Sequence, residues 1–363
     1  MSVYDLLSPW IPEPYSGYVW PAYLSATALA GSRFSVVRHE GILRGSGLRG
    51  SFDVVARAGW VGTHFAERLF ETESTAAHAG SCSVYGIRSG GADLTIALVS
   101  RYLSSRVFGE RWMRMPSWVG HMAASPVDPA ARRAILDRTD DDVRRTRRRK
   151  FRYEIDRSPD SVAGFHRDYY LPTIARRHGE SAWTYSPALF HRESRNGAIL
   201  WVLSGDEKIA GIFFQAAPPV IRVRASAVAG GDLELIQKGA MAACYVFLFQ
   251  AANELGCEWI DYRGTRPSQN DGVFRYKQKW GAKLYDSPVT SIEDIGVHWA
   301  RPSASVDTFL RGYAPLFRCA GGLAAVETGV HRIPEGVSMI APPESSGDTA
   351  AFLAATTARK PPK

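Results

Sequence analysis

The sequence predicts an α+β protein built from two tandem units, each a mixed and mostly antiparallel sheet flanked by helices. Length is the first reason, because 363 residues exceed what one hydrophobic core normally holds, and two domains of about 150 residues each are expected. The second reason is order, since strand-like and helix-like segments follow one another similarly in both halves. Composition agrees, because a hydrophobic share of 45% is typical of folded globular proteins.

We expect four regions along the chain. Residues 1–150 form the first unit, which has a basic helix at its end, and residues 151–300 form the second unit. Residues 301–341 form a smaller C-terminal segment. Residues 342–363, rich in proline, serine, threonine and alanine, form a flexible tail.

In the first unit, the aromatic and proline residues of positions 1–30 predict an ordered extended arm. After this arm, β-branched and alternating apolar residues predict strands, and apolar residues at helical spacing predict a helix. The expected strands are Arg33–Val37, Asp53–Ala58, Ser83–Ile87 and Leu94–Tyr102, and the expected helix is Trp60–Phe70. Residues Trp118–His121 predict a turn, and Asp128 is expected to cap a helix that runs through Leu136.

The first unit ends in a strongly basic stretch. An acidic run, Asp140–Asp142, precedes a dense group of cations, which are Arg144, Arg145, Arg147, Arg148, Arg149, Lys150 and Arg152. On a helix this order places carboxylates toward the N-terminal end and cations toward the C-terminal end, which suits the helix dipole. Two interpretations stay open: a solvated helix, or a surface that binds anions.

The second unit repeats the alternation of strands and helices. Its clearest predicted helix is Leu233–Leu255, ended by Gly256, and an amphipathic helix is predicted at Ser161–Arg177. Turns are expected at Gly205-Asp206 and Pro218-Pro219. The expected strands are Phe151–Ile155, Ile199–Leu203, Ile209–Gln215, Val220–Ala227 and Trp259–Tyr262, and a short helix follows at Asp271–Lys279. This order predicts an antiparallel sheet interrupted by one parallel pair.

Charge and composition narrow the function classes. The net charge of +8 favours polyanionic partners, although many basic enzymes bind no nucleic acid. No apolar run reaches the roughly 20 residues that a membrane span needs, and the N-terminus lacks a secretory signal pattern. Four cysteines without metal-site spacing predict a reduced, cytoplasmic setting. No Gly-x-Ser-x-Gly elbow indicates a hydrolase, and histidines and cysteines do not cluster as metal ligands.

Five motifs, in a fixed order, resemble those of a known enzyme family. They are the turn Met115–Gly120, the basic segment Arg144–Arg149, the helix end Arg176–Gly179, the strand end Asp261–Gly264 and the segment Asn270–Gly281. Together with the order of elements, they resemble the GNAT superfamily and, within it, the tandem Fem-type aminoacyltransferases and related acyltransferases linked to cellulose biosynthesis. In that family a C-terminal segment returns to the first unit, so the resemblance implies that residues 301–341 dock there.

The resemblance implies a reaction centre around Lys277. In Fem-type enzymes the lysine of the aromatic-Lys pair is associated with the reaction centre, and Tyr276 stands here where the family commonly has Phe. An ammonium there suits the oxyanion that forms when an amine attacks an ester, and the alternative is a surface lysine on a cationic helix. Asp261 is expected to accept a proton or hold the amine, or else to cap the turn after its strand.

Substrate contacts are expected from the segment around this lysine. Arg263 and Arg266 suit bidentate binding of a phosphate or a carboxylate, and the alternative is that they are exposed loop arginines. Asn270 and Trp280 belong to the matched signature, so the resemblance implies that they also contact the substrate.

The donor is expected to be aminoacyl-tRNA, with acyl-CoA as the alternative. A CoA-dependent enzyme of this superfamily usually holds the pyrophosphate with a glycine-rich loop that opens a helix. The spacing of Ala229–Gly239 does not fit such a loop, and Arg44–Gly47 is only a fragment of one. The residues expected to bind tRNA are Arg144, Arg145, Arg148, Arg149 and Arg152.

These observations predict the transfer of an aminoacyl group to an amine of a small metabolite or a cell-wall precursor. Neither a cofactor nor a metal is expected. The alternatives are an acyl-CoA-dependent N-acyltransferase, and a noncatalytic binding protein with a GNAT-like fold.

Overall fold

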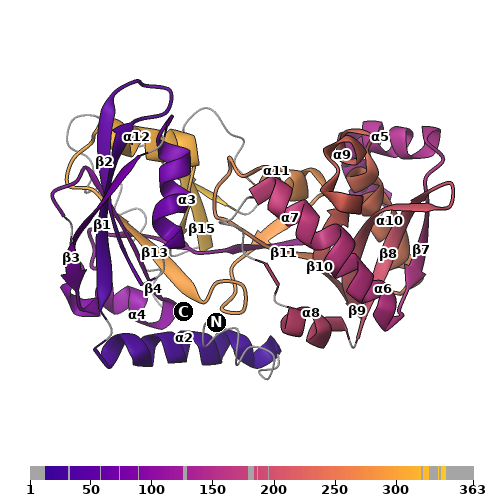
Figure 1. Cartoon of the computed structure of the whole chain (residues 1–363), viewed down its shortest axis with the longest axis horizontal. Coiled ribbons are helices and arrows are strands. Elements are labelled where there is room, and N and C mark those ends of the chain that lie inside the picture. Colours follow the sequence, from indigo (N-terminus) through magenta and orange to yellow (C-terminus); the bar gives the residue numbers. More distant parts are fainter. Residues whose placement is uncertain are drawn as a thin grey trace. The chain divides into compact units, whose positions relative to one another are not determined.

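The computed structural model describes residues 13–31, 33–57, 59–72, 74–88, 90–125, 129–178, 184–185, 187–194, 196–319, 322–326, 334 and 337–340. These residues form two compact units, each assembled from separate segments of the chain (Figure 1). The central unit comprises His121–Arg263 and Tyr276–Lys283, and the terminal unit comprises Glu13–Gly120, Gly264–Arg275 and the residues from Leu284 on. None of the described helices has the length and apolar character needed to cross a membrane.

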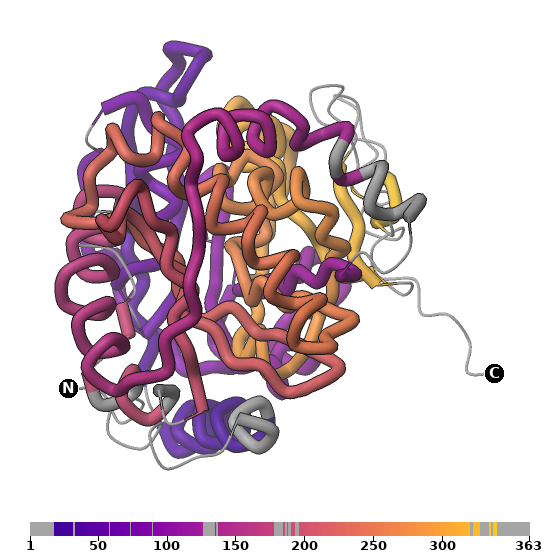
Figure 2. The backbone as a smooth tube through the Cα atoms, turned by 90° about the vertical axis from the view of Figure 1, so that its right-hand side faces the viewer, coloured from indigo at the N-terminus to yellow at the C-terminus, as the bar shows by residue number. Residues whose placement is uncertain are grey.

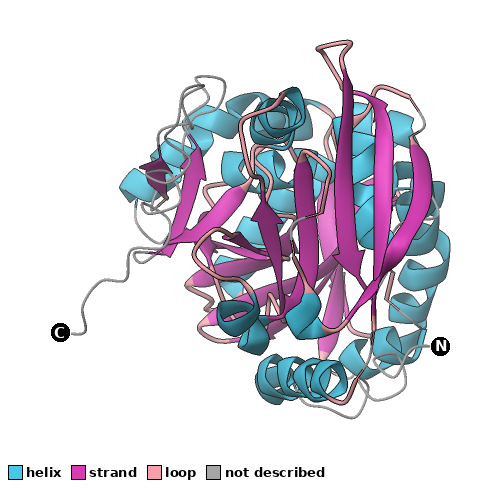
Figure 3. Ribbon diagram, turned by 90° about the vertical axis from the view of Figure 1, so that its left-hand side faces the viewer, coloured by secondary structure: helices cyan, strands magenta, loops and turns pink. Residues whose placement is uncertain are grey.

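The terminal unit is built on a six-stranded sheet of order β3-β1-β2-β4-β13-β5 (Figure 3). Its strands are β1 (Phe34–Ile42), β2 (Arg49–Ala56), β3 (Thr75–Cys82), β4 (Leu94–Ser100), β5 (Met113–Pro116) and β13 (Glu293–His298). β2 and β4 run parallel, whereas every other neighbouring pair in this sheet is antiparallel. The sheet is therefore mixed and mostly antiparallel, as predicted, and it takes one inner strand from a distant part of the sequence.

Helices cover both faces of this sheet. Successive side chains of a strand point to opposite faces, so those of the inner strands are buried in two different cores. On β2, Phe52 and Val54 face one hydrophobic core, and Val55 faces another. The first core is closed by α3 (Trp60–Leu69), α12 (Ala304–Thr308) and the π-helical turn η6 (Phe309–Tyr313). The second core is closed by α2 (Glu13–Leu29) and α4 (Arg101–Val107).

A second, smaller sheet belongs to the same unit. It consists of β14 (Leu316–Cys319), β15 (Gly322–Val326) and β16 (Ser338–Ile340). Phe317 of β14 and Ala324 of β15 contribute to the same core as Phe65 of α3. Residues beyond position 300 are therefore packed against residues of the first hundred.

The central unit is built on a seven-stranded sheet of order β12-β6-β11-β10-β9-β8-β7. Its strands are β6 (Val119–Ala124), β7 (Arg152–Asp156), β8 (Gly197–Ser204), β9 (Glu207–Ala217), β10 (Val220–Val228), β11 (Trp259–Thr265) and β12 (Lys283–Tyr285). β7 to β10 are joined antiparallel, and β10 pairs parallel with β11. The predicted strands of this part and the turns at Gly205-Asp206 and Pro218-Pro219 are confirmed within a few residues.

The middle strands of this sheet are also buried on both faces. Leu200 of β8 faces the core of α10 (Ala240–Glu254), and Trp201 faces the opposite core. That opposite core is closed by α6 (Pro159–Gly164), η3 (Phe165–Tyr170), α7 (Leu171–His178) and α8 (Pro187–Ser194). α10 is apolar on nearly every side, as expected for an enclosed helix, and α5 (Pro129–Arg148) packs against it (Figure 2).

The predicted extended arm is wrong for its described part, because Glu13–Leu29 form the helix α2. Pro21 lies inside this helix and interrupts its hydrogen bonding. The Pro21 carbonyl, which is unaffected by the missing N–H, accepts hydrogen bonds from the hydroxyls of Ser25 (2.6 Å) and Ser100 (2.7 Å). Trp20 is buried beside it, so tertiary contacts stabilise a helix that the proline content argued against.

Three boundaries in the first part of the chain differ from the prediction. The strand expected at Ser83–Ile87 is wrong, because β3 ends at Cys82 and Val84–Gly86 form a 3-10 turn. β4 ends at Ser100, whose hydroxyl caps α4, so the last residues of that predicted strand are helical. The turn predicted at Trp118–His121 is the start of β6, because this segment pairs within the seven-stranded sheet.

The predicted helix Leu233–Leu255 is two helices, because α9 (Leu233–Gln237) ends before Gly239. Gly239 has φ of 94°, a conformation that favours glycine, and a Cβ there would lie 2.7 Å from Cδ of Arg145. The basic helix is the last part of α5 and stops at Arg148, since Lys150 turns with φ of 54° and β7 follows. The predicted cap at Asp128 and the tail 342–363 lie outside the described residues.

Candidate functional site

Lys277 lies on α11 (Gly272–Lys279), the short helix predicted to follow β11. Its side chain is buried rather than exposed, with a residual exposure of 6%. The amino nitrogen Nζ donates a hydrogen bond to the backbone carbonyl of Arg263 at 3.2 Å. The alternative of an ordinary surface lysine is therefore wrong, because a buried amine needs a polar partner and here has one.

Arg263 lies inside β11, and its carbonyl accepts from Lys277 where the strand backbone leaves the extended conformation. Arg263 has φ of 63°, a left-handed conformation that is uncommon for a residue with a Cβ. Asp261, which is 4% exposed, accepts a hydrogen bond from the Arg263 backbone N–H at Oδ1 (2.8 Å). A carboxylate that binds the backbone two residues on stabilises such a conformation. Asp261 thus binds the backbone that follows it, as the alternative of a capping residue predicted.

His121 is a neighbour of Lys277 that the sequence analysis did not single out. It lies on β6 in the same sheet as β11, and its side chain is fully buried. Burial first, and then the charge of Lys277, lower the pKa of His121 well below its ordinary value, so the imidazole is neutral. Its Nδ1 lies 3.4 Å from the amide Nε2 of Gln278. No spacing in the sequence links His121 to Lys277, because one lies on the strand β6 and the other on the distant helix α11.

Aromatic side chains surround this region of the central unit. The ring of Tyr245 on α10 lies 5.3 Å from that of Tyr262, 5.0 Å from Tyr276 and 5.5 Å from Trp280, centroid to centroid. Burial raises the pKa of Tyr262 and of Tyr276 well above the ordinary value, so both remain neutral phenols. Trp280 is only 1% exposed, so its indole packs in the core and was wrongly expected to face a substrate.

The other predicted substrate residues, Arg266 and Asn270, belong to the terminal unit. The Asn270 amide donates to the backbone carbonyls of Arg311 (3.1 Å) and Gly312 (2.5 Å), which ties the loop to the end of η6. The Arg266 guanidinium lies against two indoles, with Cζ 4.0 Å from the ring centroid of Trp60 and 4.3 Å from that of Trp118. Asn270 therefore has a structural role, whereas Arg266 has an unusual environment.

The predicted tRNA-binding arginines divide into two groups. Arg144 pairs with Asp140 (3.1 Å) and Asp141 (2.7 Å), and Arg152 binds the turn at Gly205-Asp206. Arg145 is half-buried and reaches the Gln237 carbonyl at 3.5 Å. Arg148 and Arg149 are exposed, and within the described parts of the chain no carboxylate pairs with either. These two are the best placed of the set to meet a polyanion.

The two glycine-containing segments do not form a pyrophosphate cradle. Arg44–Gly47 turns between β1 and β2 and opens no helix, and its Arg44 side chain binds the backbone carbonyls of Glu67 and Phe70. At the start of α9, the Asp232 carboxylate accepts a hydrogen bond from the Glu234 N–H (2.8 Å). A pyrophosphate bound at the start of α9 would need the first free backbone N–H groups of the helix. One of these, the N–H of Glu234, already donates to Asp232.

Comparison with known proteins finds resemblance only among solved structures. No protein-family model and no curated protein matches the chain. FemX matches with a TM-score of 0.37 at 9% identity, over 79% of this chain and 96% of FemX. L-PGS from Bacillus licheniformis matches with a TM-score of 0.34 at 12% identity, over 83% and 96%. A GCN5-related N-acetyltransferase-like protein from Streptococcus suis matches with a TM-score of 0.28 at 12% identity, over 79% and 96%.

Proposed function

We propose that the protein is an aminoacyltransferase that forms an amide bond. It would transfer an aminoacyl group from aminoacyl-tRNA to an amine of a small metabolite or a cell-wall precursor. The observation that carries this proposal is Lys277, which stands in the aromatic-Lys pair of the matched signature and is buried and held by the Arg263 carbonyl. A lysine without a function at that position would more commonly be exposed to solvent.

The proposed reaction needs one positive charge at a defined place. The acceptor amine attacks the ester carbonyl of the donor, so a C–N bond forms and negative charge gathers on the carbonyl oxygen. Lys277, as an ammonium, stabilises this oxyanion, with the neutral phenol of Tyr276 as its neighbour. The C–O bond to the tRNA then breaks, and the proton lost by the amine ends on the ribose hydroxyl. Asp261 acts indirectly in this scheme, because it holds the backbone of Arg263, which positions Lys277.

A tRNA donor is favoured over acyl-CoA by two observations. Arg148 and Arg149 offer exposed charge at the end of α5, and the chain carries a net charge of +8. Neither glycine-containing segment offers the row of free backbone N–H groups that would bind the pyrophosphate of CoA. The acyl-CoA-dependent N-acyltransferase is therefore the second candidate.

The test compares donors directly. The purified protein is incubated with a mixture of labelled aminoacyl-tRNAs or with a panel of acyl-CoA thioesters, each with the same set of primary amines. We expect labelled amide from the tRNA mixture alone, formed about 10²-fold or more slowly by the Lys277→Ala variant. Lys238→Ala is the control, because Lys238 is an exposed lysine of the same unit that pairs with Glu234. Amide formed from acyl-CoA alone would contradict the tRNA donor, and no amide from either donor would contradict acyl transfer.

A further inference from the structure

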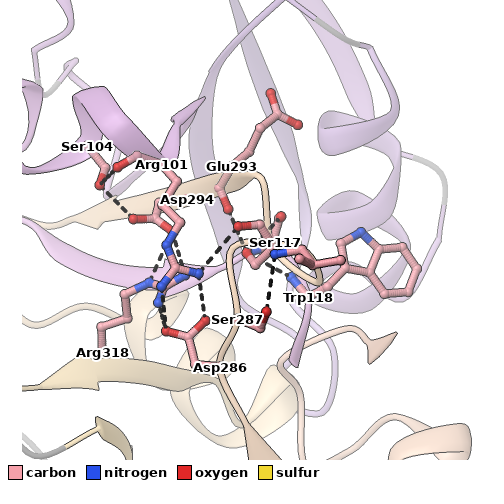
Figure 4. A network of polar contacts seen from close by, with 11 residues as sticks. Arg101, Ser104, Ser117, Trp118, Asp286, Ser287, Glu293, Asp294 and Arg318 are labelled. Carbon is pink, nitrogen blue, oxygen red and sulfur yellow. Dashed lines mark hydrogen bonds and ion pairs between the residues drawn. The ribbon is translucent and has the colours of Figure 1, made fainter. Parts of the chain in front are cut away.

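The Arg266 guanidinium in the terminal unit lies against two indole rings. Its Cζ atom lies 4.0 Å from the ring centroid of Trp60 on α3 and 4.3 Å from that of Trp118. The backbone before Trp118, which Figure 4 shows beside Ser117, is fixed because the Ser117 N–H donates to the Ser291 hydroxyl at 2.9 Å. Two indole faces stabilise a cation well, but they accept no hydrogen bonds in the plane of the guanidinium. The edge of the guanidinium, which carries its N–H donors, still needs hydrogen-bond acceptors.

That edge has no protein partner among the residues that the structure describes. Nη1 of Arg266 is inaccessible to solvent and has no hydrogen bond, and no described carboxylate forms an ion pair with the guanidinium. Burial lowers the pKa of Arg266 to about 10, so the cation is kept at a cost. A buried donor without an acceptor loses free energy, and such groups are rare in native proteins.

Three other arginines of the same unit form ion pairs with carboxylates. Arg38 binds Asp53 at 2.8 Å, and Arg101 binds Asp286 with two hydrogen bonds of 2.9 and 3.2 Å. Arg318 bridges the Asp286 carboxylate and that of Asp294 (Figure 4). Carboxylates thus pair with Arg38, Arg101 and Arg318 around this sheet. Arg266 has no carboxylate partner among the described residues, although the same unit contains carboxylates that pair with these other arginines.

Two further polar groups bear on the surroundings of Arg266, one on its own loop and one through its charge. The amide oxygen Oε1 of Gln269, on the same loop, is buried and unbonded in the described part of the protein. The Glu293 carboxylate points away from the network of Arg101, Asp286 and Arg318 in Figure 4. Burial raises the pKa of Glu293 to about 7, while the charges of Arg57 and Arg266 lower it. The charge of Arg266 therefore acts on the Glu293 carboxyl, but the two groups form no direct ion pair.

We propose that Arg266 is the anchor of a binding site for the carboxylate of a small organic acid. A carboxylate presents two oxygens in one plane, which matches the N–H donors along a guanidinium edge. A phosphate would project additional oxygens above and below that plane, toward the indoles of Trp60 and Trp118. Glu293, when ionised, would also repel a dianion more strongly than a single carboxylate. This inference concerns binding alone and requires neither Lys277 nor an acyl donor.

The test is a titration of the full chain with succinate, and separately with inorganic phosphate. Binding is followed by the indole N–H resonances of Trp60 and Trp118, and by the Nε–H resonance of Arg266, in heteronuclear NMR spectra. We expect a saturable shift of these three signals with succinate, and a weaker response to phosphate. Arg266→Lys keeps the charge but loses the planar donors, so it should weaken succinate binding about tenfold or more.

Arg275→Lys is the matched control, because Arg275 is an exposed arginine of the same unit, and it should leave the affinity unchanged. No saturable shift with succinate in the wild-type protein would overturn the site. Phosphate that binds as tightly as succinate would overturn the assignment to carboxylates. The wild-type Nε–H signal decides both questions without a substitution, so the result does not depend on whether Arg266→Lys folds.

Discussion

The side chain of Lys277 donates a hydrogen bond to the backbone carbonyl of Arg263, with Nζ and O 3.2 Å apart. Arg263 presents this carbonyl because its backbone is left-handed, with φ of 63°, and the Asp261 carboxylate holds its N–H. The candidate catalytic lysine is therefore positioned by a strained residue within β11. Strain of this kind concentrates at functional sites, where the surrounding structure maintains it.

Replacing Lys277 by alanine should lower turnover about 10²-fold or more if its ammonium stabilises an oxyanion, by analogy with the loss of one such donor. The free energy of unfolding should also fall, by about 1–3 kcal/mol, because the Arg263 carbonyl loses its buried partner. Lys277→Arg should restore part of the stability but little of the activity, since the guanidinium places its charge differently. Steady-state kinetics and urea unfolding of the same samples check both effects. Full activity in Lys277→Ala would remove Lys277 from the mechanism.

The backbone conformation at Arg263 can be tested through its two supports. Asp261→Ala should destabilise the fold by about 1–2 kcal/mol, because the left-handed residue loses its side-chain acceptor. Asp261→Asn should cost much less, since an amide oxygen accepts the same hydrogen bond. Arg263→Gly should offset part of the loss in Asp261→Ala, because glycine adopts positive φ without strain. Thermal unfolding of the single and double variants measures the coupling, and strictly additive effects would contradict the proposed link.

Charge reversal at Arg148 and Arg149 should weaken tRNA binding, because both are exposed and lack a paired carboxylate in the described structure. Each lost phosphate contact should reduce the slope of log affinity against log salt by about 0.7–0.9. Arg167→Glu is the control, since Arg167 is an exposed arginine of the same unit that pairs with Asp168 at 2.6 Å. Filter binding at several salt concentrations gives the slopes. Equal losses in the control and the double variant would show a general charge effect only.

Glu293 should make the terminal unit less stable as the pH rises. Burial raises its pKa to about 7, above its ordinary value near 4.5, so the folded protein binds a proton that the unfolded chain releases. Stability is then greatest below about pH 4.5 for this group and is lost progressively up to about pH 7, by about 3 kcal/mol at most for a pKa shift of this size. Glu293→Gln should flatten this dependence. Glu110→Gln, at an exposed position, should not, and urea unfolding at several pH values compares them.

Patterns with a local physical cause were predictable. α3 and the strands β7 to β10 follow from apolar periodicity, and Gly256 ends α10 with φ of 67° as a glycine at that position should. The position of Lys277 was also predictable, because its signature is a contiguous segment. The predicted ends of helices and strands were wrong where a residue distant in the sequence forms a hydrogen bond at that end. Ser100 caps α4 and also binds Pro21 of α2, which no local pattern contains.

The sequence by itself determined the class of fold, the mixed character of the sheets and the segment that carries the candidate site, because these depend on periodicity and on residues adjacent in the chain. Only the tertiary structure decided that Lys277 is buried, that His121 lies beside it, and that Arg266 lies against Trp60 and Trp118. These relationships join residues up to about two hundred positions apart. Burial and electrostatic environment arise when strands pair and helices pack, so they cannot be derived from local order alone.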